Sequence, residues 1–304
     1  MGTEGDDTPL YPGRVVEPNL LRTPILDWYA ANARDLPWRR PDATPWGVLV
    51  SEIMLQQTPV VRVLPVWEEW MARWPTPKAL AAEPSGEAVR HWGRLGYPRR
   101  ALRLHACAQA ITEEHGGEVP SDHATLLGLP GIGEYTAAAV ASFAYGGRHA
   151  VLDTNVRRVF ARAVTAVEYP PTATSAAERR LAEALLPAVG APTWGVAVME
   201  LGALVCTARS PRCADCPIAG SCAWRLAGKP PHDGPERKGQ TYAGTDRQCR
   251  GRLLAVLRAA HGPVPKAALD AVWDDAVQRE RALDGLITDG LAEVLDNDTY
   301  QLPR

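Results

Sequence analysis

A chain of 304 residues, 46% of them hydrophobic, can bury a sizeable core and is long enough for two domains. No apolar run reaches about eighteen residues, which argues against a membrane-spanning helix, and residues 1–18 lack the basic start and apolar centre of a secretory signal. The formal net charge of −2 excludes a general attraction to polyanions, so any contact with nucleic acid requires local clusters of arginine or lysine. We expect residues 1–19 to be a disordered tail of a cytoplasmic protein.

Residues 20–227 are predicted to form an all-α domain. Apolar side chains recur there at helical spacing, as in Val60, Leu64 and Trp67, and no segment alternates in the manner of a strand. Prolines punctuate the region, and because a proline begins or ends a helix, we expect roughly ten short helices.

Residues 90–103 are the clearest local concentration of positive charge. Their sequence, RHWGRLGYPRRALR, places five arginines around an aromatic and glycine-containing break, where backbone can approach a phosphate closely. Taken alone, this segment would be interpreted as the solvated face of a helix.

The turn Leu129-Pro130-Gly131-Ile132-Gly133 is predicted to join two helices. Gly131 and Gly133 leave backbone amides bare, so that the turn can bind a DNA phosphate at the amino end of the next helix. By itself it could be only a tight connection between helices. About twenty residues later comes Asp153, followed by a loop of four cysteines, and this combination favours a DNA-binding hairpin.

Four cysteines follow the spacing Cys206-x6-Cys213-x2-Cys216-x5-Cys222, whereas Cys107 and Cys249 stand alone in apolar segments. Thiolates that converge from one loop suit a 4Fe-4S cluster. Zinc is the alternative, but zinc ligands usually come as two similar pairs joined by a longer spacer. The spacing therefore predicts an iron-sulfur cluster, with Arg209 and Arg212 available to bind a phosphate.

Beyond the cysteines the composition changes. Residues 228–246 are rich in proline, glycine and charge, and we expect a linker there. Three further helices and a closing hairpin are then predicted at residues 250–261, 265–272, 274–287 and 291–302. They indicate a small winged-helix-like domain over residues 247–304. Its third helix is more acidic than basic, so we expect a packing or partner-binding module and not a DNA reader.

The order of hairpin, aspartate and cysteine loop resembles the endonuclease III superfamily of helix-hairpin-helix glycosylases over residues 20–227. Three segments are similar to its adenine DNA glycosylase (MutY) branch: DLPWR at residues 35–39, VSEIMLQQT at residues 50–58 and ELGALVC at residues 200–206. The resemblance implies a helix-hairpin-helix DNA glycosylase fold with a 4Fe-4S cluster loop. It also implies a base-excision-repair enzyme that removes adenine mispaired with 8-oxoguanine or guanine from double-stranded DNA.

Depurination requires an acid that protonates the departing base and a carboxylate that stabilises positive charge on the sugar. The resemblance implies that Glu52 protonates adenine at N7 and later helps to activate water. It implies that Asp153 stabilises or briefly traps the sugar, with retention at the anomeric carbon. Alone, Glu52 would be an ordinary solvated acid and Asp153 a helix cap, but the apolar neighbours of Glu52 favour a buried site with a raised pKa.

Tyr135 stands where bifunctional members of the superfamily have a lysine that forms a Schiff base. We therefore predict hydrolysis without strand scission. In this interpretation Tyr135 and Asn155 support Asp153 by hydrogen bonds.

Extrusion of a base leaves a gap in the duplex. The resemblance assigns the side chains that fill the gap to Gln57 and Tyr97, although Pro98 stands where the family commonly has a second aromatic residue. It also implies that Trp38 and Arg39 line the adenine pocket, where a tryptophan beside a proline would otherwise be a core residue.

Many adenine DNA glycosylases carry a Nudix-like domain that helps to recognise 8-oxoguanine, and residues 247–304 do not resemble one. Two other interpretations stay open. One is a glycosylase for thymine or uracil opposite guanine, and the other is a non-catalytic iron-sulfur protein that binds DNA. We expect a monomer without membrane contact that acts alongside downstream repair proteins.

Overall fold

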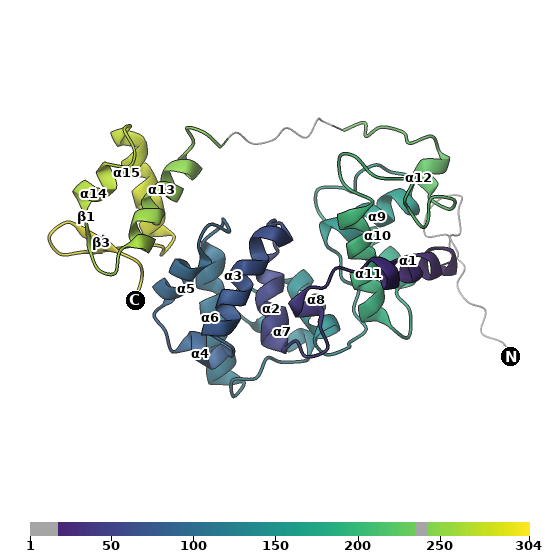
Figure 1. Ribbon diagram of the computed structural model, residues 1–304, viewed down its shortest axis with the longest axis horizontal. Helices are drawn as coiled ribbons and strands as arrows, with labels where there is room; N and C mark the ends of the chain where they lie inside the picture. Colours follow the sequence, from purple (N-terminus) through teal and green to yellow (C-terminus); the bar gives the residue numbers. More distant parts are fainter. Residues whose placement is uncertain (1–17, 235–241) are drawn as a thin grey trace. The chain divides into compact units, whose positions relative to one another are not determined.

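A computed structural model describes residues 18–234 and 242–304 of the chain (Figure 1). These residues form two compact units, and the boundary at Thr136 and Ala137 falls inside helix α8 (Glu134–Phe143). The first unit holds residues 18–43 and 137–234, and the second holds residues 44–136 and 242–304. Most of the predicted tail and part of the predicted linker lie outside the described residues. The region predicted as one glycosylase domain is thus shared between two units.

The first unit is helical throughout its described residues. With the second part of α8 it contains α1 (Pro18–Asn32), η1 (Pro37–Arg39), α9 (Thr154–Ala163), α10 (Ala176–Leu185), α11 (Ala191–Leu204) and α12 (Ala223–Leu226). Local sequence explains several helix starts. Asp153 caps α9, and Ser175 and Glu178 form a reciprocal capping box at α10.

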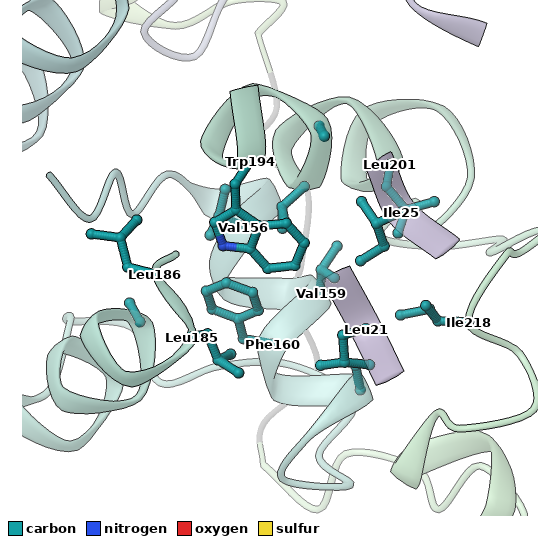
Figure 2. Close-up of a cluster of buried hydrophobic side chains, with 14 of the residues drawn as sticks. Leu21, Ile25, Val156, Val159, Phe160, Leu185, Leu186, Trp194, Leu201 and Ile218 are labelled. Atoms are coloured by element: carbon teal, nitrogen blue, oxygen red, sulfur yellow. The ribbon is translucent and has the colours of Figure 1, made fainter. Parts of the chain in front are cut away.

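The core of the first unit lies between α1, α9, α10 and α11 (Figure 2). Its apolar side chains include Leu21 and Ile25 from α1, and Val156 from α9. The rings of Phe160 and Trp194 stack with their centroids 6.3 Å apart. Because both ends of α9 are anchored in this core, Asp153 at its start has a rigid support.

The second unit begins with helices whose starts are also encoded locally. Before the first part of α8 it contains α2 (Pro45–Met54), α3 (Val60–Arg73), α4 (Pro77–Ala81), α5 (Ser85–Trp92), α6 (Arg99–Glu114) and α7 (His123–Gly128). Thr44 caps α2 by accepting a hydrogen bond from the Gly47 amide, and Pro45 occupies the first helical position. Helices in both units confirm the predicted all-α glycosylase region.

In the carboxy-terminal part of the second unit, the helices and strands follow one another in the order of a winged helix. They are α13 (Asp246–Ala259), β1 (Val264–Pro265), α14 (Lys266–Asp270), α15 (Ala276–Thr288), β2 (Glu293–Leu295) and β3 (Thr299–Gln301). The predicted hairpin is confirmed, since β2 and β3 pair in antiparallel register. Asn297 and Asp298 turn the chain with positive φ angles of 62° and 54°. Strand β1, which sequence analysis missed, pairs with β3 and makes the sheet three-stranded.

This winged-helix-like part packs against α5. The Gly86 amide donates a hydrogen bond to the Pro303 carbonyl oxygen at 2.8 Å, and Arg258 Nε donates to the Val89 carbonyl oxygen at 3.0 Å. The two arginines of α15 pair with acids, Arg279 with Asp270 and Arg281 with Asp246. Such pairing agrees with the expectation that its third helix is not a phosphate-binding surface.

Within the described ranges, no helix is both long and apolar enough to cross a lipid bilayer.

Candidate active site and iron-sulfur site

Glu52 lies in the most apolar helix of the second unit. Every residue of α2 from Trp46 to Met54 is buried, and Glu52 itself is 5% exposed. The hydroxyl of Tyr135 donates a hydrogen bond of 2.6 Å to Glu52 Oε2. A carboxyl group placed among apolar side chains and oriented by a phenol suits proton transfer to a bound base.

The hairpin before α8 brings Tyr135 to this position. Gly131 has a φ of 76°, which favours glycine, and a Cβ there would lie 2.8 Å from the Cβ of Arg103. Ile132 is buried and anchors the turn, whereas Gly133 is exposed directly before the first residue of α8. The turn therefore presents bare backbone beside a helix amino terminus, where an anion is favoured.

Asp153 occupies the amino terminus of α9 in the first unit. Its Oδ1 accepts a hydrogen bond from the Val156 amide at 2.6 Å, and its Oδ2 accepts one from Asn155 Nδ2 at 2.7 Å. Burial raises the pKa of the Asp153 carboxyl above its ordinary value, against the lowering effect of these hydrogen bonds. A carboxylate held in one orientation by these hydrogen bonds is well suited to stabilise a nearby cation.

Arg158 connects the Asp153 segment to the cysteine loop. Its Nη2 donates to Asn155 Oδ1 and to the Gly202 carbonyl oxygen, both at 2.7 Å. Its Nε donates to the Cys206 carbonyl oxygen at 2.7 Å. Sequence analysis missed Arg158. The available signal was a group of arginines, Arg157, Arg158 and Arg162, among the apolar residues of one short helix.

Gly202 permits α11 to approach α9 closely. A Cβ at this position would lie 2.7 Å from Asn155 Cβ and 2.9 Å from the Asn155 carbonyl oxygen. We expect Gly202→Ala to displace Asn155, lower the free energy of unfolding by about 2 kcal/mol and weaken catalysis. Urea unfolding and single-turnover rates measure both effects. The control is Gly195→Ala on the same helix, where a Cβ would meet Phe143 at an ordinary 3.4 Å; an equal loss there would contradict the interpretation.

Glu200 organises the segment that carries the predicted pocket residues of the first unit. The side chain of Glu200 is fully buried, with Arg34 Nε at 2.6 Å from Oε1 and Arg39 Nη1 at 2.8 Å from Oε2. Trp38, between these two arginines, is buried. Burial alone would raise the pKa of Glu200, but the hydrogen bonds and charges of Arg34 and Arg39 outweigh it and hold the pKa below its ordinary value. Arg39 thus has a fixed orientation.

Glu200→Gln is expected to lower the free energy of unfolding at pH 7 by about 3 kcal/mol, since both arginines lose their buried partner. Because the folded pKa of Glu200 is lowered, its contribution is complete above the ordinary value of 4.5 and is lost as the pH falls below it. Urea unfolding of both proteins at pH 7 and at lower pH tests this. A difference that stayed constant down to acidic pH would contradict the assignment.

Cys206, Cys213, Cys216 and Cys222 line one pocket of the first unit. Burial raises the pKa of the Cys216 thiol to about 11, so a thiolate there needs a bound cation. In the parts of the chain that the structure describes, no three potential ligands are close enough to hold a single metal ion. The order and spacing of the four cysteines along one loop fit an iron-sulfur cluster, in which each thiolate binds its own iron. Arg162, whose Nη1 donates to Cys206 Sγ at 3.4 Å, adds positive charge beside the site.

Gln57 and Tyr97 lie on two exposed turns of the second unit. Both residues have positive φ angles, 55° for Gln57 and 49° for Tyr97, which non-glycine residues rarely adopt. Their side chains are exposed, and Tyr97 is 52% accessible to solvent. Such backbone geometry is commonly maintained where a side chain must be presented for binding.

The predicted catalytic pair, Glu52 and Asp153, is divided between the two units. Their approach to opposite sides of one base-sized cavity therefore stays a prediction. So does the predicted hydrogen bond between Tyr135 and Asp153, and the raised pKa predicted for Glu52. The structure does place Tyr135 against Glu52, a contact that sequence analysis did not anticipate.

Comparisons with known proteins identify the family of the chain. Residues 50–185 match the profile of the HhH-GPD superfamily base excision DNA repair protein, and residues 206–222 match the iron-sulfur binding domain of endonuclease III. Adenine DNA glycosylase of Mycobacterium tuberculosis (strain ATCC 25618 / H37Rv) is 54% identical over 283 residues, covering 92% of this chain and 93% of that protein. Adenine DNA glycosylase of Mycolicibacterium smegmatis is 56% identical over 279 residues, covering 91% and 94%.

A solved structure described as a thermostable thymine-DNA glycosylase shares the fold. Its TM-score is 0.63 at 27% identity, over 69% of this chain and 97% of that chain. The mycobacterial similarity extends further, because an alignment that covers 92% of the chain must include part of residues 242–304. The winged-helix-like part is thus included in the similarity to those relatives.

Proposed function

The chain belongs to the adenine DNA glycosylase family, within the HhH-GPD superfamily of base excision repair proteins, and we propose that it removes adenine mispaired with 8-oxoguanine or guanine. It is a DNA N-glycosylase with a 4Fe-4S cluster held by Cys206, Cys213, Cys216 and Cys222. Its substrate is double-stranded DNA, and we propose that it acts as a monomer upstream of other repair proteins.

The contact between Glu52 and Tyr135 carries the proposal for the chemistry. Glu52 is the general acid that protonates adenine at N7 as the glycosidic bond breaks, and it then helps to activate the attacking water. Tyr135 orients its carboxyl through the 2.6 Å hydrogen bond. Burial among the apolar residues of α2 supports this role, because a low-dielectric site favours the protonated carboxyl group.

Asp153 stabilises the positive charge that develops on the sugar, with retention at the anomeric carbon. The hydrogen bonds from Asn155 and the Val156 amide fix the direction of its carboxylate. The cluster stabilises the loop next to Arg158, and through that arginine the loop supports Asn155. We propose no chemical step at the cluster.

Base removal should leave the DNA strand intact. The hairpin offers Tyr135 and no lysine, so the chain has no amine there to form a Schiff base with the sugar. We expect borohydride to trap little covalent protein–DNA adduct on mispaired or abasic DNA, measured by denaturing gel electrophoresis. Abundant adduct would contradict a monofunctional mechanism.

The choice of mispair is tested with three duplexes: adenine opposite 8-oxoguanine, adenine opposite guanine, and thymine opposite guanine. After incubation, alkali converts abasic sites into strand breaks that report base release. We expect release of adenine from the first two duplexes and none of thymine from the third. The fold shared with the thymine-DNA glycosylase structure makes the third duplex the decisive comparison, and robust thymine release would support that alternative.

A further inference from the structure

Arg100, on α6, is a buried arginine whose guanidinium bonds to two separate chain segments. Its Nη1 donates to the carbonyl oxygens of Ile53 and Gln56, at 2.8 and 2.6 Å. Its Nη2 donates to Thr58 Oγ1 at 3.0 Å and to the Gly96 carbonyl oxygen at 3.1 Å. The first three acceptors belong to the end of α2 and the turn after it, and the fourth belongs to the turn before α6.

These bonds fall directly beside Gln57 and Tyr97, the two exposed residues with positive φ. Gln56 and Thr58 flank Gln57, and Gly96 precedes Tyr97. The guanidinium also lies 5.5 Å from the centre of the Tyr97 ring. Backbone in this sparsely populated region persists only where its surroundings impose it, and Arg100 supplies bonds on both turns.

Two further contacts reinforce this arrangement, one between the two segments and one within the segment that carries Tyr97. Thr58 Oγ1 lies 3.3 Å from the Leu95 carbonyl oxygen, and Trp92 Nε1 donates to the Gly96 carbonyl oxygen at 2.9 Å. Burial lowers the pKa of Arg100 to about 10, which still leaves the guanidinium charged at neutral pH. A charged donor bound to several carbonyl oxygens makes a stronger connection than neutral hydrogen bonds would.

We propose that Arg100 is a positioning residue that holds the Gln57 turn and the Tyr97 turn together as one wedge, so that both side chains enter the duplex while the adenine is extruded. This inference rests on the proposed function. The planar guanidinium suits the task because its fixed fork can bond to both segments at once, whereas a lysine ammonium cannot reproduce that geometry.

The test compares two duplexes under single-turnover conditions. One pairs adenine with 8-oxoguanine, and the other places adenine opposite an abasic-site analogue, where little pairing has to be broken. We expect Arg100→Lys to slow adenine release from the paired duplex about 10- to 100-fold, the effect of losing charged hydrogen bonds. On the unpaired duplex the loss should be several-fold smaller, because an unpaired base needs less help to leave the stack.

A second readout follows extrusion itself. With 2-aminopurine in place of the adenine and Glu52→Gln to prevent chemistry, fluorescence rises when the base leaves the stack. Adding Arg100→Lys should slow that rise by the same factor as base release. Thr58→Val removes the hydroxyl that bonds to both Arg100 and the Leu95 carbonyl oxygen, so it should also slow the fluorescence rise. The effects of Thr58→Val and Arg100→Lys on this rate should not be additive.

The matched control is Arg258→Met. Arg258 is also a desolvated arginine, with its pKa lowered by burial to about 10, but it bonds to Val89 and not to either turn. We expect its rates on both duplexes to stay within about twofold of the wild type. An equal loss for Arg100→Lys on the two duplexes, or an unchanged fluorescence rise, would overturn the inference. Failure of the wild type to release adenine from either duplex would instead overturn the proposed function.

Discussion

Glu52→Gln is expected to lower the single-turnover rate of adenine release by about 10³-fold, the typical scale of a general acid. Glutamine has nearly the same shape and can still accept the hydrogen bond from Tyr135, but it has no acidic proton for the departing base. The measurement is alkaline cleavage of a duplex with adenine opposite 8-oxoguanine, with enzyme in excess.

Two controls separate chemistry from folding in this experiment. Thermal unfolding and duplex binding of Glu52→Gln should match the wild type, since no packing atom is lost. Tyr135→Phe should have a smaller effect, about tenfold, because it removes the orienting bond and leaves the carboxyl group in place. Full activity of the Glu52→Gln protein would remove Glu52 from the mechanism.

Asp153→Asn is expected to cause a loss of about 10²- to 10³-fold with little change in stability. Asparagine caps a helix about as well as aspartate, so α9 should begin at the same residue. What disappears is the negative charge that offsets the cationic sugar, together with the hydrogen bond from Asn155 Nδ2, which the NH₂ group of an asparagine cannot accept. Single-turnover rates measure the loss, and thermal unfolding measures the stability.

Asp122→Asn provides the matched control for this substitution. Asp122 caps α7 in the same way, by accepting a hydrogen bond from the Thr125 amide, but it is exposed to solvent. We expect its rate of adenine release to equal that of the wild type. If both substitutions reduced the rate equally, or if Asp153→Asn unfolded the protein, the role of Asp153 would be structural and not catalytic.

Local sequence was sufficient to predict the elements that depend on neighbouring residues only. The cysteine spacing indicated the cluster loop, because all four ligands come from one segment of 206–222. Gly131 and Gly133 indicated the hairpin, and Asp296 with its neighbours indicated the closing β-turn. Each of these features depends on residues close together in the chain: residues that tolerate a positive φ form the turns, and cysteines in one loop form the cluster site. The two-residue strand β1 was missed because it has no periodicity of its own and exists only by pairing with β3.

The tertiary structure alone decided which distant polar groups meet. The sequence around Arg100, Arg158 and Glu200 does not indicate which groups they bind. Arg100 donates to the Gln56 carbonyl oxygen, Arg158 donates to the Cys206 carbonyl oxygen, and Glu200 pairs with Arg34. A buried charge is expensive unless it is paired, so these partnerships are required, but the choice among many possible partners depends on how the helices pack. The sequence by itself therefore indicated the family and the cofactor, and it predicted the cluster ligands and the candidate acids. Packing determined how Glu52, Asp153 and the two exposed turns are held, because orientation comes from contacts between residues far apart in the chain.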